Sequence, residues 1–393
     1  MTIDKANERN NRTVGQYVKR CEALSHLNVK TQTLYSYVSR NIIKAKADPQ
    51  NPGQSLYSVD DINAILSRRA RGRKLSTVAH STIAWGEPLL ETQISTVRDG
   101  RLYYRGSDAL VLSQTARLED VIQLLWDIDR PPLFAAPSGQ AEGGGESEAL
   151  IALARRVGRD PADTGRSAAA LQDGGLSVFA SLAAAFGALQ GSGVPVHIGL
   201  TQHWRCSLDA RDMIRRTLVL LADHELNAST FAVRVTASTG ASMSACLLSG
   251  LATLSGPLHG KAPAQVETLV TMAEEIGIEQ ALAKARQHDG LPPGFGHPLY
   301  PHGDPRALEL LRRLELPPIM QALAEAQARH QEAAPNIDFA LTALRRRHAM
   351  PAHAPFVLFA LSRAVGWVAH AIEQHQTGQL IRPRARYVGD PPP

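Results

Sequence analysis

The stretch Ser255-Gly256-Pro257-Leu258-His259-Gly260 places a single histidine on a tight turn between a Gly-Pro pair and a glycine. Glycine and proline set the backbone of such a turn, and they let another molecule approach the main chain closely. The turn follows a long run of small residues at helical spacing, Ala237 to Leu254, which is typical of a helix that packs closely against others. We therefore expect His259 to face a cavity at the end of a core helix.

Further blocks of the same character lie on both sides of this turn. They are Asp223-His224-Glu225-Leu226-Asn227-Ala228-Ser229-Thr230, Pro293-Gly294-Phe295-Gly296-His297, Asp304-Pro305-Arg306, Pro335-Asn336-Ile337-Asp338-Phe339 and Arg382-Pro383-Arg384. In this order and at these spacings, the blocks closely resemble the citrate synthase family. The resemblance implies an all-α fold of a large and a small helical domain, and a homodimer. It also implies the condensation of acetyl-CoA with oxaloacetate and water to give citrate and CoA, a reaction of the tricarboxylic acid cycle.

The bulk composition fits a globular helical protein of two or three domains. The chain has 393 residues, 44% hydrophobic and 5% aromatic, with frequent alanine and leucine. Cys21, Cys206 and Cys246 are scattered, which predicts neither a disulfide framework nor a zinc site and fits a reducing cytoplasm. We find no signal peptide and no apolar stretch long enough to span a membrane. We therefore expect a cytoplasmic protein without a membrane partner.

Positive charge is concentrated at the N-terminus. Residues 1–75 carry a net charge of +8, whereas the whole chain carries +5, so the remaining residues carry −3. A basic head on a mildly acidic body indicates a domain boundary and a polyanionic partner for the head.

The head has the pattern of a small helical domain. Leu24 to Val38 reads as helix, turn, helix, with Thr31 as the N-cap of the second helix, and a loop is expected from Asp48 to Gly53. In Leu56-Tyr57-Ser58-Val59-Asp60-Asp61-Ile62, a short extended piece leads into a helix capped by Ser58. This arrangement resembles the winged helix-turn-helix head of the mercury-resistance-regulator (MerR) family. That resemblance implies DNA binding through residues 14–75; a head that contacts protein instead remains an alternative.

If the head binds DNA, its contacts divide by chemistry. Basic side chains would meet phosphates, and polar side chains at the start of the second helix would meet base edges. The first group is Lys30, Arg40, Lys44 and Lys46, and the second is Thr31, Gln32 and Thr33.

These patterns predict four parts of the chain. We expect a disordered start at residues 1–13, a winged helix-turn-helix at 14–68 and a linker at 69–80. The basic run at 67–74 reads equally well as a solvated helix end. A citrate synthase-like catalytic domain would span 81–393, with a short hairpin around Leu102-Tyr103-Tyr104-Arg105-Gly106, a helix from Leu118 to Trp126 and a small subdomain at about 262–344.

The expected reaction needs a base at the acyl methyl group, a donor for the enolate oxygen and an acid at the attacked ketone. Asp338 lies between apolar neighbours that would raise its basicity, although an aspartate there could also cap the following helix. His259 resembles the family histidine that donates to the thioester oxygen as a neutral imidazole. His297 resembles the family histidine that protonates the ketone. No metal is expected.

The substrate and product are carboxylates, which guanidinium groups bind in a bidentate fork. Arg306, Arg363 and Arg382 match the carboxylate-binding arginines of the family, and Arg382 is expected to reach across from a partner subunit. His224 matches a further substrate-binding histidine. The run Gly294-Phe295-Gly296 resembles the loop whose backbone meets the adenine of CoA. Acetyl-CoA or another acyl-CoA is the co-substrate, and no permanently bound cofactor is expected.

Three positions depart from the family pattern, namely Lys261, Pro263 and Pro298. None removes a group that the chemistry needs, but they affect the expected CoA contacts and rate. Two alternatives stay open: a 2-methylcitrate synthase that uses propionyl-CoA, and a DNA-binding regulator whose synthase body senses citrate or acyl-CoA.

Overall fold

The structure is a computed structural model that describes residues 17–27, 29, 31–40, 42–48, 51–59, 61–62, 90–135, 144–330, 333–385 and 387–390. The chain divides into two compact units, Met1–Glu91 and Thr92–Pro393, which we call the head and the body. The expected disordered start (1–13), the linker (69–80) and Lys30 lie outside the described residues.

In its described residues, the head forms helices α1 and α2 and a small antiparallel sheet. Its elements are β1 (Tyr17–Lys19), α1 (Arg20–Leu27), α2 (Thr31–Ser39), β2 (Ala45–Asp48) and β3 (Asn51–Ser58), and the strand order is β1-β3-β2. The two predicted helices are confirmed. The loop expected from Asp48 to Gly53 is shorter than predicted, because β3 already begins at Asn51.

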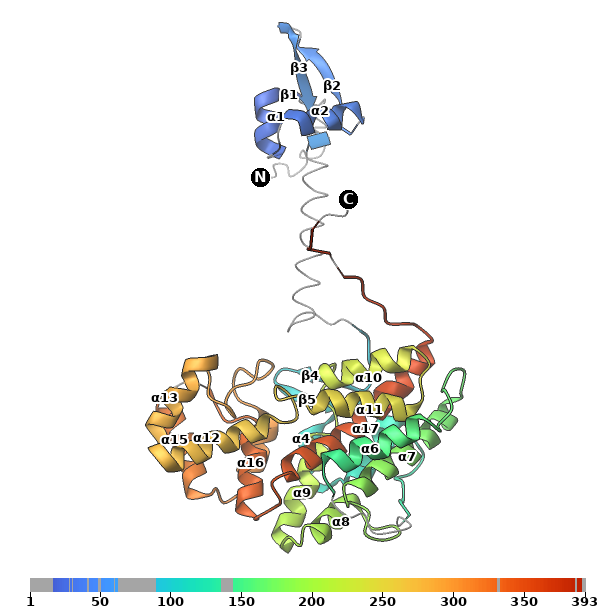
Figure 1. The fold of residues 1–393 in the computed structure, drawn as a ribbon, viewed down its shortest axis with the longest axis vertical. Helices are drawn as coiled ribbons and strands as arrows, with labels where there is room; N and C mark the ends of the chain where they lie inside the picture. The colour runs from blue at the N-terminus through green and yellow to red at the C-terminus, as the bar shows by residue number, and fades with distance from the viewer. Residues whose placement is uncertain are drawn as a thin grey trace, which may run out of the picture. The chain divides into compact units, whose positions relative to one another are not determined.

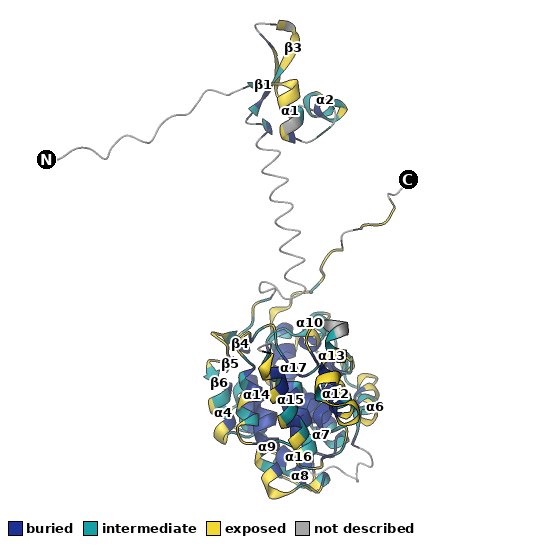
Figure 2. Ribbon diagram, turned by 90° about the vertical axis from the view of Figure 1, so that its left-hand side faces the viewer, coloured by how far each residue is buried: buried dark blue, intermediate teal, exposed yellow. Residues whose placement is uncertain are grey.

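The head has an apolar core of its own (Figure 2). Leu34 is completely buried, and the side chains of Tyr37 and Val38 on the same face of α2 pack against the core. Ser58 caps the following helical turn, because its Oγ accepts from the backbone N–H of Asp61 at 3.3 Å. This cap was predicted from the sequence.

The body begins with a three-stranded antiparallel sheet, β4 (Ser95–Arg98), β5 (Arg101–Tyr104) and β6 (Ser107–Asp108). Two helices follow, α4 (Ala109–Thr115) and α5 (Leu118–Trp126), so the predicted hairpin and helix are confirmed. The buried hydroxyl of Tyr104 donates to the carbonyl oxygens of Val219 and Leu220, at the end of α9 (Leu208–Leu220), and so joins the sheet to the helical core.

The larger group of helices surrounds α17 (Ala354–Thr377) in Figure 1, and most residues of α17 are buried. The others are α6 (Glu146–Val157), α7 (Ala168–Ala185), α8 (Val196–His203), α9 (Leu208–Leu220), α10 (Ala228–Ser238) and α11 (Met243–Leu254). Helices α5, α7, α9, α10 and α11 all contact α17 directly. This central helix therefore carries the residues that most of the fold holds in place.

A smaller group of helices lies to one side of the body in Figure 1. It consists of α12 (Ala262–Ile276), α13 (Ile278–Asp289), α15 (Pro318–Arg329) and α16 (Ile337–Arg347), with α14 (Pro305–Leu311) between the two groups. The turn with His259 lies between α11 and α12, where the chain passes from the larger group to the smaller one.

The small-residue run from Ala237 to Leu254 is not one helix, which corrects the sequence-based expectation. Helix α10 ends at Ser238 and α11 starts at Met243, with Gly240 at φ +79° between them and Ser242 as the new N-cap. Close packing does occur at Gly250, where a Cβ would lie 2.8 Å from both Val233 and Trp367.

In the described part of the chain, two helices have the length and apolar composition of a membrane span, α7 with mean hydropathy 1.2 and α17 with 1.5, although the sequence analysis found no such stretch. The apolar segment of α17 is entirely buried inside the body, which is typical of a core helix. One or two such helices are weak evidence for a membrane protein.

Candidate functional site

His259 is held by the hydroxyl group of Ser229. Its Nε2 lies 2.9 Å from Ser229 Oγ, which also accepts from the indole N–H of Trp367 at 3.2 Å and lies 2.8 Å from the Oδ1 of Asn227. The hydroxyl has one proton to give. When it donates that proton to His259, the imidazole carries its own proton on Nδ1, and when it donates to Asn227, the imidazole proton lies on Nε2.

His259 is a neutral imidazole at neutral pH. Burial, and to a smaller extent the charge of Arg363, lowers its pKa to about 4. The ring of Phe359 lies between the two groups, because it packs edge-on against the His259 ring and stacks under the Arg363 guanidinium. His259 thus has the charge state that a hydrogen-bond donor to a thioester oxygen needs.

Arg363 is a buried cation that no carboxylate neutralises directly. Its side chain on α17 is 1% exposed, and its Nε donates to the carbonyl oxygen of Leu221 at 3.1 Å. Burial lowers its pKa to about 10, so the guanidinium stays charged at neutral pH. Among the described residues, no carboxylate forms an ion pair with it. Because an unpaired buried charge is costly, the site is suited to an anionic ligand. We call Phe359, Arg363 and Trp367 the helix wall.

The opposite side is built by two paired segments, residues 294–306 and 334–338, which we call the loop wall. Phe295 and Pro335 form a β-bridge, and the N–H of Asn336 donates to the carbonyl oxygen of Gly294 at 2.8 Å. Gly294 has φ +88° and Gly296 has φ +75°, a left-handed backbone that glycine adopts without strain. This pairing ties the segment carrying His297 to the one carrying Asp338.

Arg306, unlike Arg363, forms an ion pair, and its partner is Asp304. Its Nε and Nη2 donate to the two carboxylate oxygens of Asp304 at 2.9 and 2.8 Å, and both side chains are buried. Burial by itself would raise the pKa of Asp304, but the guanidinium holds it below its usual range. Asp304 also accepts from the backbone N–H of Ile337 at 3.2 Å. This ion pair therefore fastens together the two segments of the loop wall.

His224, His297 and Tyr300 form a cluster of rings. Nε2 of His224 lies 2.8 Å from the hydroxyl oxygen of Tyr300, and the centroid of the His297 ring is 5.4 Å from that of His224 and 5.0 Å from that of Tyr300. The Arg306 guanidinium lies 5.4 Å from the centre of the Tyr300 ring. The sequence analysis missed Tyr300, because a tyrosine in a loop rich in proline and glycine shows no periodic pattern.

Both histidines of this cluster are neutral. Burial lowers the pKa of His297 to about 4, with Arg306 adding to the effect. Nδ1 of His297 accepts from the N–H of Leu299 at 3.2 Å, so the ring proton of the neutral form lies on Nε2. Burial also lowers the pKa of His224 well below 6.5, and the positive charges of Arg306 and Arg363 lower it further. The structure thus brings five of the predicted residues near one another.

Asp338 lies in the first turn of α16. Asn336 caps this helix, since its Oδ1 accepts from the backbone N–H groups of Asp338 and Phe339 at 3.0 and 3.4 Å. The Asp338 carboxylate is therefore not the helix cap, and among the described residues it has no hydrogen-bond partner. Burial raises its pKa to about 7, although Arg306 opposes this effect. A carboxylate with a pKa near 7 is a much stronger base than an ordinary aspartate.

The turn that carries His224 is anchored from behind. The buried carboxylate of Asp223 bonds to the hydroxyl of Ser95 and lies 3.2 Å from Nε2 of His370. Gly366 passes so close that a Cβ there would lie 2.2 Å from Oδ1 of Asp223. His224 is thus fixed to α17 and to β4 through its neighbour in the chain.

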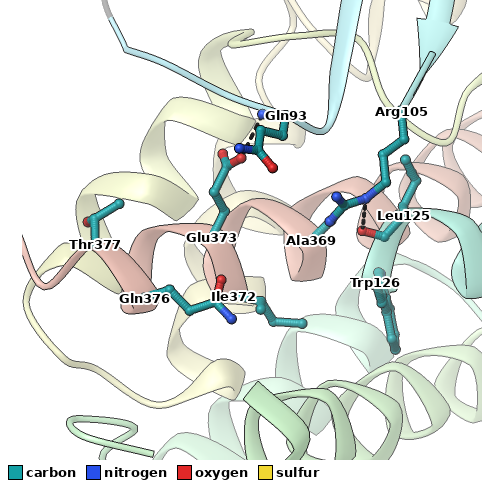
Figure 3. A pocket seen from close by; sticks show the side chains of 9 residues that line it. All are labelled: Gln93, Arg105, Leu125, Trp126, Ala369, Ile372, Glu373, Gln376 and Thr377. Carbon is teal, nitrogen blue, oxygen red and sulfur yellow. Dashed lines mark hydrogen bonds between the residues drawn. The ribbon is translucent and has the colours of Figure 1, made fainter. Parts of the chain in front are cut away.

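A cavity of about 250 Å³ lies away from these residues, near the C-terminal end of α17 (Figure 3). Gln93, Arg105, Trp126 and Glu373 are among the side chains that line it. None of the predicted catalytic residues does. We place the candidate site between the two walls, on the charges and ring contacts gathered there rather than on this cavity.

Three predicted positions lie outside the cluster. Arg382 is exposed in the C-terminal segment. Lys261 pairs with Glu146 at 2.9 Å, so this departure from the family pattern links the start of α12 to α6. Pro298 is exposed. In the part of the chain that the structure describes, no group of three or more His, Cys, Asp or Glu side chains could hold a metal ion.

Comparison with known proteins identifies this arrangement. The sequence model of the citrate synthase family, C-terminal domain, matches residues 200–384. A citrate synthase of Haloferax volcanii is 36% identical over 185 residues, which cover 44% of this chain and 49% of that protein. The chain thus spans about half the length of the curated relatives it matches.

Solved structures extend the likeness to the whole body. The citrate synthase of Thermotoga maritima MSB8 is 26% identical with a TM-score of 0.63, over 78% of this chain and 94% of that one. The citrate synthase of Thermoplasma acidophilum, solved in a ternary complex with carboxymethyl coenzyme A and oxaloacetate, matches with a TM-score of 0.60 at 22% identity, over 78% of this chain and 95% of that one. Residues 200–384 of this chain thus match the C-terminal domain of the citrate synthase family, and its body has the fold of solved citrate synthases.

Proposed function

We propose that this protein condenses acetyl-CoA with oxaloacetate and water to give citrate and CoA. The observation that carries the proposal is Arg363, a fully buried guanidinium without an ion-pair partner among the described residues. Its charge lowers the pKa of the neutral His224 and His259, and a second buried arginine, Arg306, is close enough to lower its own pKa. A small dianion such as oxaloacetate would neutralise this charge and supply acceptors for the N–H groups of both arginines.

Each chemical role then falls to a group with a suitable charge state. Asp338, with a pKa of about 7, takes a proton from the methyl carbon of acetyl-CoA. His259 donates a hydrogen bond through Nδ1 to the thioester oxygen, which requires Ser229 to donate its hydroxyl proton to Nε2. His297 delivers a proton from Nε2 to the ketone oxygen as the new carbon–carbon bond forms. Water then cleaves the thioester and releases CoA.

Binding roles are assigned in the same way. His224, Arg306 and Arg363 would hold oxaloacetate, and the backbone of Gly294-Phe295-Gly296 would meet the adenine of CoA. Acetyl-CoA is a co-substrate here, not a permanently bound cofactor. The exposed side chain of Arg382 would complete the site of a second copy of this chain. This last assignment rests on the family resemblance and makes the active protein a homodimer, which light scattering of the purified protein tests directly.

The test of the activity is thiol release. The purified full-length protein should release CoA thiol from acetyl-CoA only when oxaloacetate is present, with citrate formed in equal amount. Thiol release that does not depend on oxaloacetate would contradict the proposal. A panel of acyl-CoA substrates separates acetyl-CoA from propionyl-CoA, the substrate of the 2-methylcitrate synthase alternative.

We further propose that the head is a MerR-like winged helix-turn-helix that binds DNA. Helices α1 and α2 followed by the β2–β3 hairpin support this assignment, as does the exposure of Arg40, Lys44 and Lys46. Binding should weaken steeply with salt as phosphate counterions are released. In gel-shift titrations, no binding to any genomic fragment at low salt would leave the head as a protein-contacting domain.

A regulator that senses its substrates remains the second candidate function, favoured by the joining of a basic head to a body with a charged ligand site. It predicts that oxaloacetate or citrate changes the affinity for DNA, and that DNA changes the affinity for the ligand by the same factor. We expect either activity to take place in the cytoplasm.

A further inference from the structure

Tyr300 contacts three residues of the candidate substrate site but has no assigned role. It is 2% exposed, and its hydroxyl lies 2.8 Å from Nε2 of His224. Its ring contacts those of His224 and His297 and lies beside the guanidinium of Arg306. A side chain in this position can determine how the neighbouring groups present their protons.

The hydrogen bond between Tyr300 and His224 leaves two arrangements. A neutral imidazole carries one N–H, on either Nδ1 or Nε2. If Tyr300 donates, Nε2 of His224 is the acceptor and the proton lies on Nδ1. If His224 donates from Nε2, then Nδ1 has only a lone pair to offer.

The ligand decides between these arrangements. With Nε2 occupied by Tyr300, Nδ1 is the ring nitrogen left for the substrate. Every polar atom of oxaloacetate is an oxygen that accepts hydrogen bonds, so a bare Nδ1 would repel it, whereas Nδ1–H would bind it.

We propose that Tyr300 is a positioning residue for His224: its hydroxyl donates to Nε2 and so keeps the ring proton on Nδ1, where an oxygen of oxaloacetate accepts it. This proposal rests on the function proposed above. Two charge states agree with it, because burial raises the pKa of Tyr300 to about 12 and lowers that of His224 well below 6.5. The phenol therefore keeps its proton, and the imidazole is neutral.

The first test separates oxaloacetate binding from the rest of the reaction. In Tyr300→Phe, the KM for oxaloacetate should rise roughly 10- to 100-fold, the range for a lost hydrogen bond to a charged group. The KM for acetyl-CoA at saturating oxaloacetate should change less than about 3-fold on the same reasoning. Tyr103→Phe is the matched control, since Tyr103 lies on β5 and is only partly buried.

A double variant shows whether Tyr300 acts through His224. In a His224→Gln background there is no imidazole tautomer left to fix, so adding Tyr300→Phe should raise the KM for oxaloacetate no further. A purely structural role of Tyr300 would add its full effect in both backgrounds, and that result would overturn the proposal.

The second test needs no activity and reads the tautomer directly. In full-length protein with ¹⁵N-labelled histidine, the two ring nitrogens of His224 should show the Nδ1–H tautomer, with the signals assigned by their loss in His224→Gln. Tyr300→Phe should shift them toward Nε2–H, and Tyr103→Phe should not. An Nε2–H tautomer in the wild-type protein overturns the proposal, even if Tyr300→Phe fails to fold. An absence of thiol release with an Nδ1–H signal would instead count against the proposed function alone.

Discussion

The helix wall and the loop wall each contribute one buried arginine, yet the two arginines are held differently. Among the residues that the structure describes, Arg363 on α17 has only a backbone carbonyl as its hydrogen-bond partner, whereas Arg306 forms a two-point ion pair with Asp304. The difference separates two uses of the same side chain. Arg363 is a cation kept ready for an anion, whereas Arg306 is also a structural fastener of the loop wall.

The same contrast extends to the surroundings of each wall. The helix wall is fixed by burial in the centre of the body, and its charge costs stability until a ligand arrives. The loop wall is fixed by hydrogen bonds between segments 294–296 and 334–336 and by the Asp304–Arg306 pair. Substitutions should therefore affect stability at the loop wall and ligand binding at the helix wall.

The largest effect should come from the two arginines themselves. Arg306→Met leaves Asp304 buried without its partner and should destabilise the protein by about 3–5 kcal/mol, the usual cost of breaking a buried ion pair. Arg363→Met removes an unpaired charge and should change stability by less than about 1 kcal/mol. Urea unfolding of both variants makes the comparison, and equal destabilisation would remove the distinction between the walls.

The next largest effect should come from Asp338, the proposed general base on the loop wall. Asp338→Asn should lower kcat by at least ~10²-fold, the lower range for a positioned general base. The fold should persist, because the substitution removes a buried charge and Asn336 still caps α16. Asp173→Asn, at an exposed position on α7, is the matched control. A kcat like that of the wild type would exclude Asp338 from the mechanism.

Binding of oxaloacetate should show that Arg363 serves the ligand. Oxaloacetate at about 100 times its Kd should stabilise the wild-type protein by about 2.7 kcal/mol through mass action. The added stability should be lost in Arg363→Met, which lacks the charge that the ligand neutralises. Thermal unfolding with and without oxaloacetate measures both values, and full protection of Arg363→Met would place the ligand elsewhere.

A smaller effect should appear in the pH dependence. The base must be ionised, and burial raises the pKa of Asp338 to about 7, so kcat/KM should fall about tenfold per pH unit below that value. His259 and His297, with pKa values of about 4, stay neutral over the same range. The stability of the fold depends on pH in the opposite sense. Because folding raises the pKa of the Asp338 carboxyl, this group stabilises the protein at pH values below its pKa in the unfolded chain, and the contribution is lost as pH rises through 7. A wild-type profile flat from pH 5 to 8 would contradict the assignment.

The smallest effect should come from the head. Deleting residues 1–75 should leave thiol release nearly unchanged, because every candidate catalytic residue lies in the body. DNA binding, if present in the full chain, should disappear with the head. A large loss of thiol release in the shortened protein would show that the site depends on the head.

Local sequence signals predicted much of the fold and of the site. The helix from Leu118 to Trp126 and the cap at Ser58 follow from residue patterns within a few positions. The residues His224, His259, His297 and Arg306 were picked out because each lies in a short block of glycine, proline or polar residues, whereas Arg363 lies in an apolar run and was picked out by the family resemblance alone. Such blocks are visible in a single sequence.

Long-range contacts were out of reach of the same reasoning. Ser229 meets His259 and Trp367 across 30 and 138 positions, and Tyr300 meets His224 across 76. No local pattern marks such partners. The break between α10 and α11 could have been found, because Thr239-Gly240 followed by Ser242 is a stop signal and then a start signal.

The hydrogen bond between the backbone N–H of Gln93 and Glu373, drawn in Figure 3, has a consequence for engineering. It places the first residues of the body beside the end of its last helix, 280 positions later in the chain. A body whose chain ends meet in this way can be circularly permuted, and can accept a different domain at that junction, without crossing its core. The body is therefore a portable module, and exchanging the head is a practical way to attach its proposed activity to another protein.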